Sequence, residues 1–355
     1  MKNNDTVKKR KAAAAGNIGI DIIPQFKCKE SSCFDDVIKP GHITHIEGSE
    51  IHPGGSPANT GLAMNIFGTD TIICGKTGND HFGQMLKNMI TSLAGKKAAS
   101  GLIPDEDIHT AWSVILAVPG LDRSILQNPG ANDLFGCDDI DFDTISECSL
   151  LHFGHPPSMK KMYSNEGEEL TKLFKKAHSN GLLTSLDMCS VDPDSDAGKQ
   201  DWKKILEHIL PLTDFFVPSE DELRYMLKAR KDTAPDALAA EARKMGASNI
   251  LIKCGSKGMY YSNGDAQAIS EIASKLEIPA GSMESWTDAN GYAPAKKVKK
   301  EVSGLGAGDT SIAAYLSAML QGLPFEKCVD LALTEGALCV GTPDALSGLL
   351  PFEQL

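Results

Sequence analysis

The sequence has no excess of positive charge, because 35 Lys and Arg residues are outnumbered by 47 Asp and Glu residues and the net charge is −12. A protein that binds nucleic acid or an anionic membrane over a broad surface is usually basic there, so neither partner is expected. An anionic nucleotide remains compatible with this charge, since backbone N–H groups and a few local cations can hold phosphate.

Cysteine motifs and long apolar runs are also missing. The nine cysteines form no C-x-x-C pair and no zinc spacing, which indicates reduced thiols that act as small apolar residues. No apolar stretch of the kind found in a secretory signal follows the basic residues 8–11, and no run approaches the length of a membrane span. We therefore expect a cytoplasmic protein with a disordered tail over residues 1–11.

Strand-like and helix-period segments alternate through most of the chain, which predicts one α/β domain over residues 12–355. The expected strands cover residues 19–23, 71–74, 112–118, 150–153, 182–186, 215–217 and 249–253. The expected helices cover residues 57–67, 82–93, 160–179, 202–209, 220–228, 235–245, 307–321 and 325–340. This order favours a mainly parallel sheet with helices on both faces, with ligands at the carboxyl ends of its strands.

Two segments, at about residues 24–53 and 108–127, lack helical period and are typical of short strands and turns. Together they could form a small β-sheet over the edge of the main sheet, so we interpret them as a lid.

The segment Gly304-Leu305-Gly306-Ala307-Gly308-Asp309-Thr310 precedes an apolar helix. Its small residues let a ligand approach the backbone, and the helix start presents N–H groups and a positive dipole end. This arrangement predicts an anion hole in which Asp309 accepts a proton from an attacking hydroxyl. In the alternative interpretation, the glycines form a tight loop and Asp309 only caps the helix.

A second glycine pair, Gly54-Gly55, lies just before a helix that begins near Ser56-Pro57. The pair allows close approach to a polyol, and Asn59 can donate and accept toward hydroxyls; an ordinary turn would explain the same residues. Gly75-Lys76-Thr77 is not a P-loop, because that motif needs a glycine where Asp70 stands. We interpret it as a strand-to-helix turn.

These segments, in this order and spacing, resemble the ribokinase-like (PfkB) carbohydrate kinase family. The resemblance covers nearly all of the chain after the tail. It implies a Rossmann-like domain with a β-sheet lid, ATP as phosphoryl donor, Mg²⁺, a sugar or nucleoside hydroxyl as acceptor, and a homodimer joined through the lid.

The resemblance also implies roles for individual residues. The catalytic base would be Asp309, with Gly306, Ala307 and Gly308 as anion hole. The substrate would contact Asp21, Gly54, Gly55 and Asn59. The nucleotide would contact Ser219, Lys253, Gly255, Ser256 and Gly258. Glu222 would act on Mg²⁺ through water.

Three departures from the family pattern bear on function. Ser219 replaces an asparagine, so its nucleotide contact is expected to be weaker or water-mediated. Ser303-Gly304-Leu305 replaces Asp-Thr-Thr in a loop that helps to bind a monovalent cation, which leaves K⁺ dependence open. Gly154-His155 stands where ribokinases have a sugar-binding glutamate. His155 therefore either contacts a different substrate or only makes hydrogen bonds within its own loop.

The expected function is phosphoryl transfer from ATP to a hydroxyl of a sugar or sugar-like small molecule. One alternative is a nucleoside (adenosine-like) kinase on the same fold, for which Phe26, Phe34 and Trp112 in the lid could form a base pocket. The other is a catalytically silent sensor that binds sugar or nucleotide. Arg123, at the expected lid turn, either reaches an anionic group of the substrate or is solvated.

Overall fold

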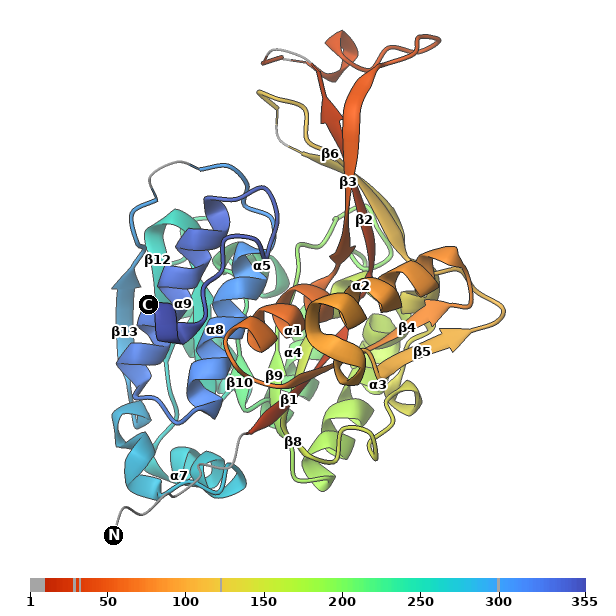
Figure 1. The fold of residues 1–355 in the computed structure, drawn as a ribbon. Coiled ribbons are helices and arrows are strands. Elements are labelled where there is room, and N and C mark those ends of the chain that lie inside the picture. The colour runs from red at the N-terminus through yellow and green to blue at the C-terminus, as the bar shows by residue number, and fades with distance from the viewer. Residues whose placement is uncertain (1–9, 28–29, 32, 122, 299–300) are drawn as a thin grey trace.

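The computed structural model describes residues 10–27, 30–31, 33–121, 123–298 and 301–355, and they form a large α/β unit with a smaller β-sheet standing above it (Figure 1). The large sheet has nine strands. In order across the sheet they are β13 (Asn290–Pro294), β12 (Gly258–Ser262), β11 (Asn249–Lys253), β10 (Phe215–Phe216), β9 (Leu183–Leu186), β8 (Cys148–Gly154), β1 (Lys11–Gly16), β4 (Thr71–Gly78) and β5 (Gly101–Asp105). In this order, all neighbouring strands between β11 and β5 pair in parallel. Strand β12 pairs antiparallel with both β11 and β13.

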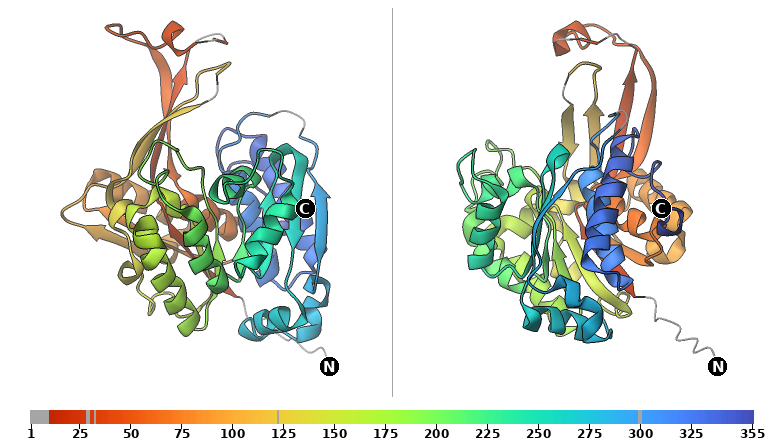
Figure 2. Two further views of the ribbon diagram at one scale, coloured as in Figure 1. Left: turned by 180° about the vertical axis from the view of Figure 1, so that it is seen from behind. Right: turned by 90° about the vertical axis from the view of Figure 1, so that its left-hand side faces the viewer.

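Helices cover both faces of this sheet (Figure 2). One face packs against α3 (Lys160–Ser179), α4 (Trp202–Ile209), α5 (Glu220–Met226) and α6 (Pro235–Lys244). The other packs against α1 (Ser56–Ile66), α2 (His81–Ala98), α7 (Ala266–Lys275), α8 (Ala307–Leu320) and α9 (Phe325–Val340). The predicted fold class, a mainly parallel sheet between two layers of helices, is confirmed. None of the helices in the described ranges is both long and apolar enough to cross a bilayer.

Strand β1 was not predicted. Its core is the run Ala12–Ala15, and alanine favours helices over strands when judged by propensity alone. All four alanines are fully buried between β8 and β4. A central parallel strand is covered by helices on both faces, so burial outweighs intrinsic propensity here.

The expected disordered tail ends earlier than predicted. Lys11 is the first residue of β1. The Arg10 guanidinium donates hydrogen bonds to the carbonyl oxygens of Leu276 (2.6 Å) and Leu320 (2.9 Å). The prediction of disorder was therefore wrong at residues 10 and 11, and residues 1–9 lie outside the described residues.

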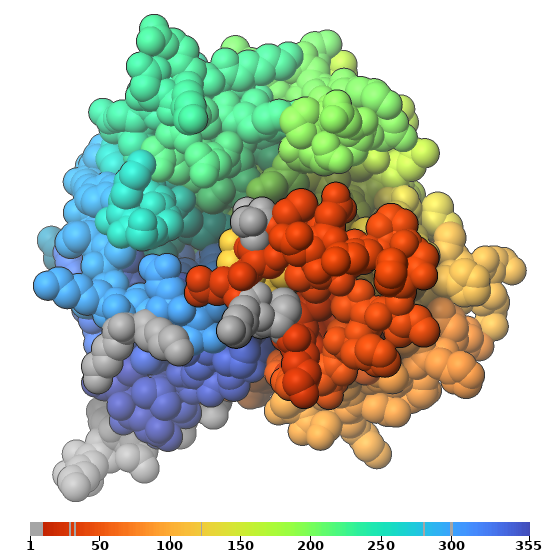
Figure 3. Space-filling model, turned by 90° about the horizontal axis from the view of Figure 1, so that it is seen from above, coloured from red at the N-terminus to blue at the C-terminus, as the bar shows by residue number. Residues whose placement is uncertain are grey.

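The small sheet contains β3 (Ile46–Gly54), β2 (Gly19–Phe26), β6 (Trp112–Leu116) and β7 (Ser124–Asn128), in that order. All pairs are antiparallel except β2 with β6. This sheet is the predicted lid, although it begins at Gly19 rather than at residue 24. Viewed from above, the N-terminal part of the lid lies over the middle of the molecule (Figure 3).

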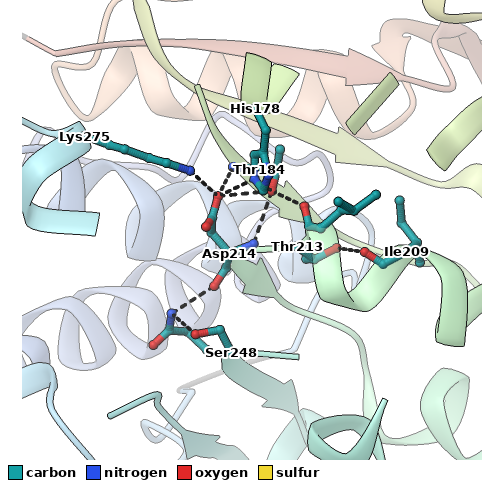
Figure 4. Close-up of polar contacts among 9 residues, drawn as sticks. His178, Thr184, Ile209, Thr213, Asp214, Ser248 and Lys275 are labelled. Atoms are coloured by element: carbon teal, nitrogen blue, oxygen red, sulfur yellow. Dashed lines mark hydrogen bonds and ion pairs between the residues drawn. The ribbon is translucent and has the colours of Figure 1, made fainter. Parts of the chain in front are cut away.

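A partly buried polar cluster surrounds Asp214, the residue directly before β10 (Figure 4). One carboxylate oxygen of Asp214 accepts from the Thr184 backbone N–H (2.8 Å) and His178 Nε2 (3.1 Å), and Lys275 Nζ lies 3.7 Å away. Burial alone would raise the pKa of Asp214, but these donors and cations lower it. The cluster joins β9, β10 and α7 and so supports β10, which is only two residues long.

Glu335 in α9 is a buried acid with an incomplete set of partners. Its side chain is fully buried, and only Oε2 accepts a hydrogen bond among the described residues, from Leu350 N–H at 3.4 Å. Burial raises the pKa of Glu335 to about 7. The folded protein therefore holds this proton over a pH range in which the unfolded chain has lost it.

We expect Glu335→Gln to stabilise the protein at neutral pH. The wild-type protein should lose stability relative to this variant as pH rises from about 4.5 to about 7, by about 2–3 kcal/mol in total, since each pKa unit corresponds to about 1.4 kcal/mol. Denaturant unfolding at pH 4, 5, 6 and 7.5 measures the difference. Glu326→Gln, at an exposed position of α9, is the control. A constant difference between Glu335→Gln and wild type across this range would contradict the assignment.

Candidate active site

A cavity of about 1150 Å³ opens at the carboxyl ends of the main-sheet strands, on the side of the lid. Asp21 and Ser113 contribute to it from the lid, and the residues that follow β8, β9 and β10 contribute from the main sheet. Every predicted site residue except Gly54 lines this cavity: Asp21, Gly55, Asn59, His155, Ser219, Glu222, Lys253, Gly255, Ser256, Gly258, Gly306, Ala307, Gly308 and Asp309. Residues far apart in sequence thus meet where an open α/β sheet binds ligands.

The start of α8 lies beside the cavity, at the position where the sequence predicts an anion hole. Gly306, the residue before the helix, has φ = 75°, a left-handed conformation that favours glycine. A Cβ atom at this position would lie only 2.3 Å from the Cβ atom of Ala345. The first N–H groups of α8 have no acceptor within the helix, so they can bind an anion in the cavity.

Asp309, in the first turn of α8, is held by two residues of α1. Asn59 Nδ2 donates to Asp309 Oδ2 at 3.0 Å, and Thr60 Oγ1 donates to Oδ1 at 3.4 Å. The carboxyl group is only 8% exposed but faces the cavity. The contact of Asn59 with substrate stays a prediction, whereas the structure shows that Asn59 orients Asp309. Thr60 was missed, although it follows Asn59 directly in the sequence.

Asp21 in β2 lies beside the glycine pair that precedes α1. A Cβ atom at Gly54 would lie 2.3 Å from Asp21 Oδ2, so Gly54 makes room for this carboxyl group and does not line the cavity itself. Gly55 has φ = 86° and its backbone packs on the Asn17 carbonyl. Burial raises the pKa of Asp21 to about 6, although a hydrogen bond with Ser113 opposes the shift.

The opposite end of the cavity contains the residues predicted to contact nucleotide. Gly255 and Gly258 have φ = 56° and 127°, and a Cβ atom at Gly258 would lie 2.1 Å from the Ala293 carbonyl oxygen. Gly258 therefore packs closely on β13, whereas no atom lies within 4 Å of a Cβ atom at Gly255, and both glycines line the cavity. This geometry suits a ligand that lies flat along the turn.

Ser219 and Glu222 form a capping box at the start of α5. The Ser219 N–H donates to Glu222 Oε2 at 2.7 Å, and Ser219 Oγ accepts from the Glu222 N–H at 3.3 Å. The Ser219 hydroxyl is therefore engaged in the helix cap. Glu222 lines the cavity, and its carboxylate offers the hard oxygen ligands that suit Mg²⁺ bound through water.

Asp187, directly after β9, is a site residue that the sequence reasoning missed. Its carboxyl group is 2% exposed, and Oδ1 accepts from Lys253 Nζ at 2.6 Å. His155, in the left-handed conformation at φ = 62°, places Nε2 3.9 Å from Asp187 Oδ2 and 3.8 Å from Asp309 Oδ1. The position of Asp187 at the end of a buried strand was the available signal.

His155, Asp187 and Asp309 place one potential ligand atom each within 4.8 Å of one another. The Lys253 ammonium group, however, already lies against Asp187. That cation would repel a metal ion. We therefore interpret His155, Asp187 and Asp309 as a cluster of charged and polar side chains around Lys253, and not as a metal site.

The segment Gly75–Gly78 differs from the prediction of a strand-to-helix turn. Gly75–Gly78 is the end of β4 and not a turn, and Lys76 Nζ contacts Asp105 (3.0 Å) and Asp139 (3.2 Å). This contact agrees with the rejection of a P-loop.

Of the lid aromatics, only Phe26 lines a described cavity, a second one of about 270 Å³, whereas Trp112 packs on Phe82. These three aromatic residues therefore do not line either described cavity together, and the nucleoside alternative stays a prediction. Arg123 borders both cavities, and its predicted turn neighbour, residue 122, lies outside the described residues.

Comparisons with known proteins agree with this geometry. A sequence model described as "pfkB family carbohydrate kinase" matches residues 18–351. The 2-dehydro-3-deoxygluconokinase of Thermoproteus tenax is 24% identical over 311 residues, which cover 86% of this chain and 85% of that protein.

Two solved structures show the same fold. A fructokinase from Xylella fastidiosa with bound ATP has a TM-score of 0.73 at 19% identity and covers 98% of this chain and 97% of its own. An Arabidopsis thaliana ribokinase complexed with ribose and ATP has a TM-score of 0.71 at 18% identity, with coverages of 97% and 96%.

Proposed function

The chain belongs to the pfkB family of carbohydrate kinases, and from this premise we propose that it transfers the γ-phosphoryl group of ATP to a hydroxyl of a sugar or sugar-like small molecule, with Asp309 as general base. The observation that carries the proposal is the position of Asp309. Its carboxylate faces the cavity beside the N-terminus of α8 and is oriented by Asn59 at 3.0 Å. A proton acceptor and an anion site thus lie side by side, as phosphoryl transfer requires.

In the proposed reaction, Asp21, Gly55 and Asn59 hold the acceptor hydroxyls at the lid end of the cavity. Asp309 takes the proton of one hydroxyl while its oxygen attacks the γ-phosphorus. The bond from that phosphorus to the β-phosphate oxygen breaks, and ADP leaves. The N–H groups at Gly306–Gly308 bind the charge on the transferred group. Closure of the lid would exclude water and limit hydrolysis of ATP.

The nucleotide would lie along the turn between β11 and β12, in contact with Lys253, Gly255, Ser256 and Gly258. Ser219 accepts a hydrogen bond in the cap of α5, so its hydroxyl would donate to the nucleotide, directly or through water. Glu222 would hold Mg²⁺ through water, and the ion would supply positive charge to the phosphates.

The acceptor is a sugar-like molecule whose contacts differ from those in ribokinases. His155 stands in the left-handed turn after β8, where it faces the cavity near Asp309. An imidazole can donate to a hydroxyl or pair with a carboxylate. The homodimer through the lid that the resemblance implies stays a prediction; exposed Ile125 and Leu126 on β7 support it.

A screen of acceptors tests the proposal. Purified protein with ATP and Mg²⁺ is assayed for ADP release with pentoses, hexoses, sugar acids, sugar phosphates and nucleosides. We expect turnover on one of the sugar classes well above ATP hydrolysis without acceptor. Turnover on nucleosides alone would favour the nucleoside kinase, and ATP binding without turnover on any acceptor would favour the silent sensor.

We expect turnover to be independent of K⁺. The Leu305 carbonyl oxygen, in the loop before the anion hole, is contacted by Cys339 Sγ at 3.4 Å. The nearby carbonyl oxygens of Asp344 and Ala345 accept from Thr342 and Thr310. A cation would have to compete with these donors for its oxygen ligands.

Assays in matched KCl, NaCl and tetramethylammonium chloride should therefore agree within about twofold, the variation expected from ionic strength alone. A selective activation by K⁺ of about tenfold or more, equivalent to about 1.4 kcal/mol, would refute this prediction.

A further inference from the structure

Lys253, the last residue of β11, places a cation beside the anion hole. Its side chain is 12% exposed and reaches across the end of β10 toward β9. The ammonium nitrogen lies 3.6 Å from the point that a Cβ atom at Gly308 would occupy. Lys253 Nζ is therefore adjacent to the first turn of α8, whose N–H groups are the proposed site of the transferred phosphoryl group.

The charge around Lys253 keeps it protonated. Asp187 Oδ1 contacts the ammonium group at 2.6 Å, and Glu222 and Asp309 face it from α5 and α8. Burial alone would lower the pKa of Lys253, but these three carboxylates raise it. His152 in β8 is fully buried and is held neutral, because burial and the Lys253 cation lower its pKa to about 3.

Asp187 fixes where this cation lies. Its backbone N–H donates to the Phe153 carbonyl oxygen at 2.9 Å, which ties the end of β9 to β8. Its side chain is nearly inaccessible, so the carboxylate has little freedom to move. An ammonium group on a flexible four-carbon stem is thereby held in one position.

We propose that Lys253 is a catalytic residue, which donates to the γ-phosphoryl group as it is transferred, and that Asp187 is the positioning residue that aims it. This inference rests on the proposed kinase function and extends it. As the acceptor oxygen bonds to phosphorus and the bond to the β-phosphate oxygen breaks, negative charge spreads over the phosphoryl oxygens. A preorganised ammonium group beside the anion hole stabilises that charge without moving.

A purely structural ion pair would give different kinetics. If Lys253 only neutralised Asp187, their replacement would lower the stability of the protein but leave kcat of the folded fraction nearly unchanged. If Lys253 acts on the transferred group, kcat falls by a larger factor than KM for ATP rises, because the contact with the bound nucleotide strengthens in the transition state.

The test is a double-mutant cycle of Lys253→Met and Asp187→Asn, measured with the best acceptor from the screen. We expect Lys253→Met to lower kcat by about 10²–10³-fold, the usual effect of removing one donor to a developing anion. Asp187→Asn should lower kcat by about tenfold, because a catalytic group held out of position typically slows the reaction by about 10- to 100-fold. The double variant should resemble Lys253→Met, because Asp187 acts through Lys253.

Two further variants and a binding measurement keep the test decisive. Lys257→Met, on the same turn but 70% exposed, should stay within about twofold of wild type, as expected for a surface ion pair. Lys253→Arg keeps the charge and should retain more kcat than Lys253→Met. Thermal unfolding and calorimetric ATP binding confirm that each variant is folded.

Unchanged kcat in folded Lys253→Met, or additive effects in the double variant, would overturn this inference while leaving the kinase function intact. Absence of turnover in the wild-type protein would instead overturn the kinase function on which the inference rests.

Discussion

The Asp309→Asn variant is expected to bind ATP nearly as well as the wild-type protein and to lose about 10²–10⁴-fold in kcat, the usual contribution of a general base. Asparagine has the same shape as aspartate, and its amide oxygen can still accept the hydrogen bond from Asn59. The variant should therefore fold normally. What it loses is the ability to take a proton from the acceptor hydroxyl.

Two measurements test this expectation together. ADP release with a saturating acceptor gives kcat, and calorimetry gives the ATP affinity. Asp236→Asn, at an exposed position in the first turn of α6, is the matched control, because it makes the same chemical change outside the residues that line the cavity. Full activity in Asp309→Asn would show that another group, or water, accepts the proton.

Gly306→Ala should disrupt the anion hole and lower kcat by about 10²–10³-fold, as expected when donors to a developing anion are displaced. Gly306 has φ = 75°, and the left-handed conformation costs an alanine about 1–2 kcal/mol. The new Cβ atom would also lie 2.3 Å from the Cβ atom of Ala345. Both effects push the start of α8 away from its position in the wild-type protein.

Gly304→Ala is the control for the stability of the same loop. No atom within 4 Å opposes a Cβ atom at Gly304, and its φ lies outside the left-handed region. Thermal unfolding should therefore detect a loss of stability in Gly306→Ala but not in Gly304→Ala. Wild-type turnover in Gly306→Ala would show that the geometry at residue 306 is not needed for phosphoryl transfer.

Local signals in the sequence predicted much of this architecture. The helices from α1 to α6, and α8 and α9, lie close to their expected positions, because apolar periodicity and helix-start residues are encoded within each segment. The glycine-rich segment at 304–310 likewise predicted the start of α8 with Asp309 in its first turn.

Features that depend on tertiary neighbours were harder to predict. Strand β1 is built from Ala12–Ala15, whose strand conformation follows from burial in the centre of the sheet. The contact of Asp187 with Lys253 joins β9 to β11 across the end of β10, so it requires knowledge of the strand order. Nothing local to either residue indicates the other. The use of Ser219 as a helix cap, by contrast, follows from its spacing to Glu222 and could have been recognised.

The central claim is that the γ-phosphoryl group moves from ATP to a hydroxyl of a small sugar-like acceptor. The most direct measurement follows the label from [γ-³²P]ATP after reaction with Mg²⁺ and the best acceptor from the screen. We predict that the label appears in a phosphate ester of the acceptor in equal amount to the ADP formed. Label found only in inorganic phosphate, or no release of ADP with any acceptor, would contradict the account.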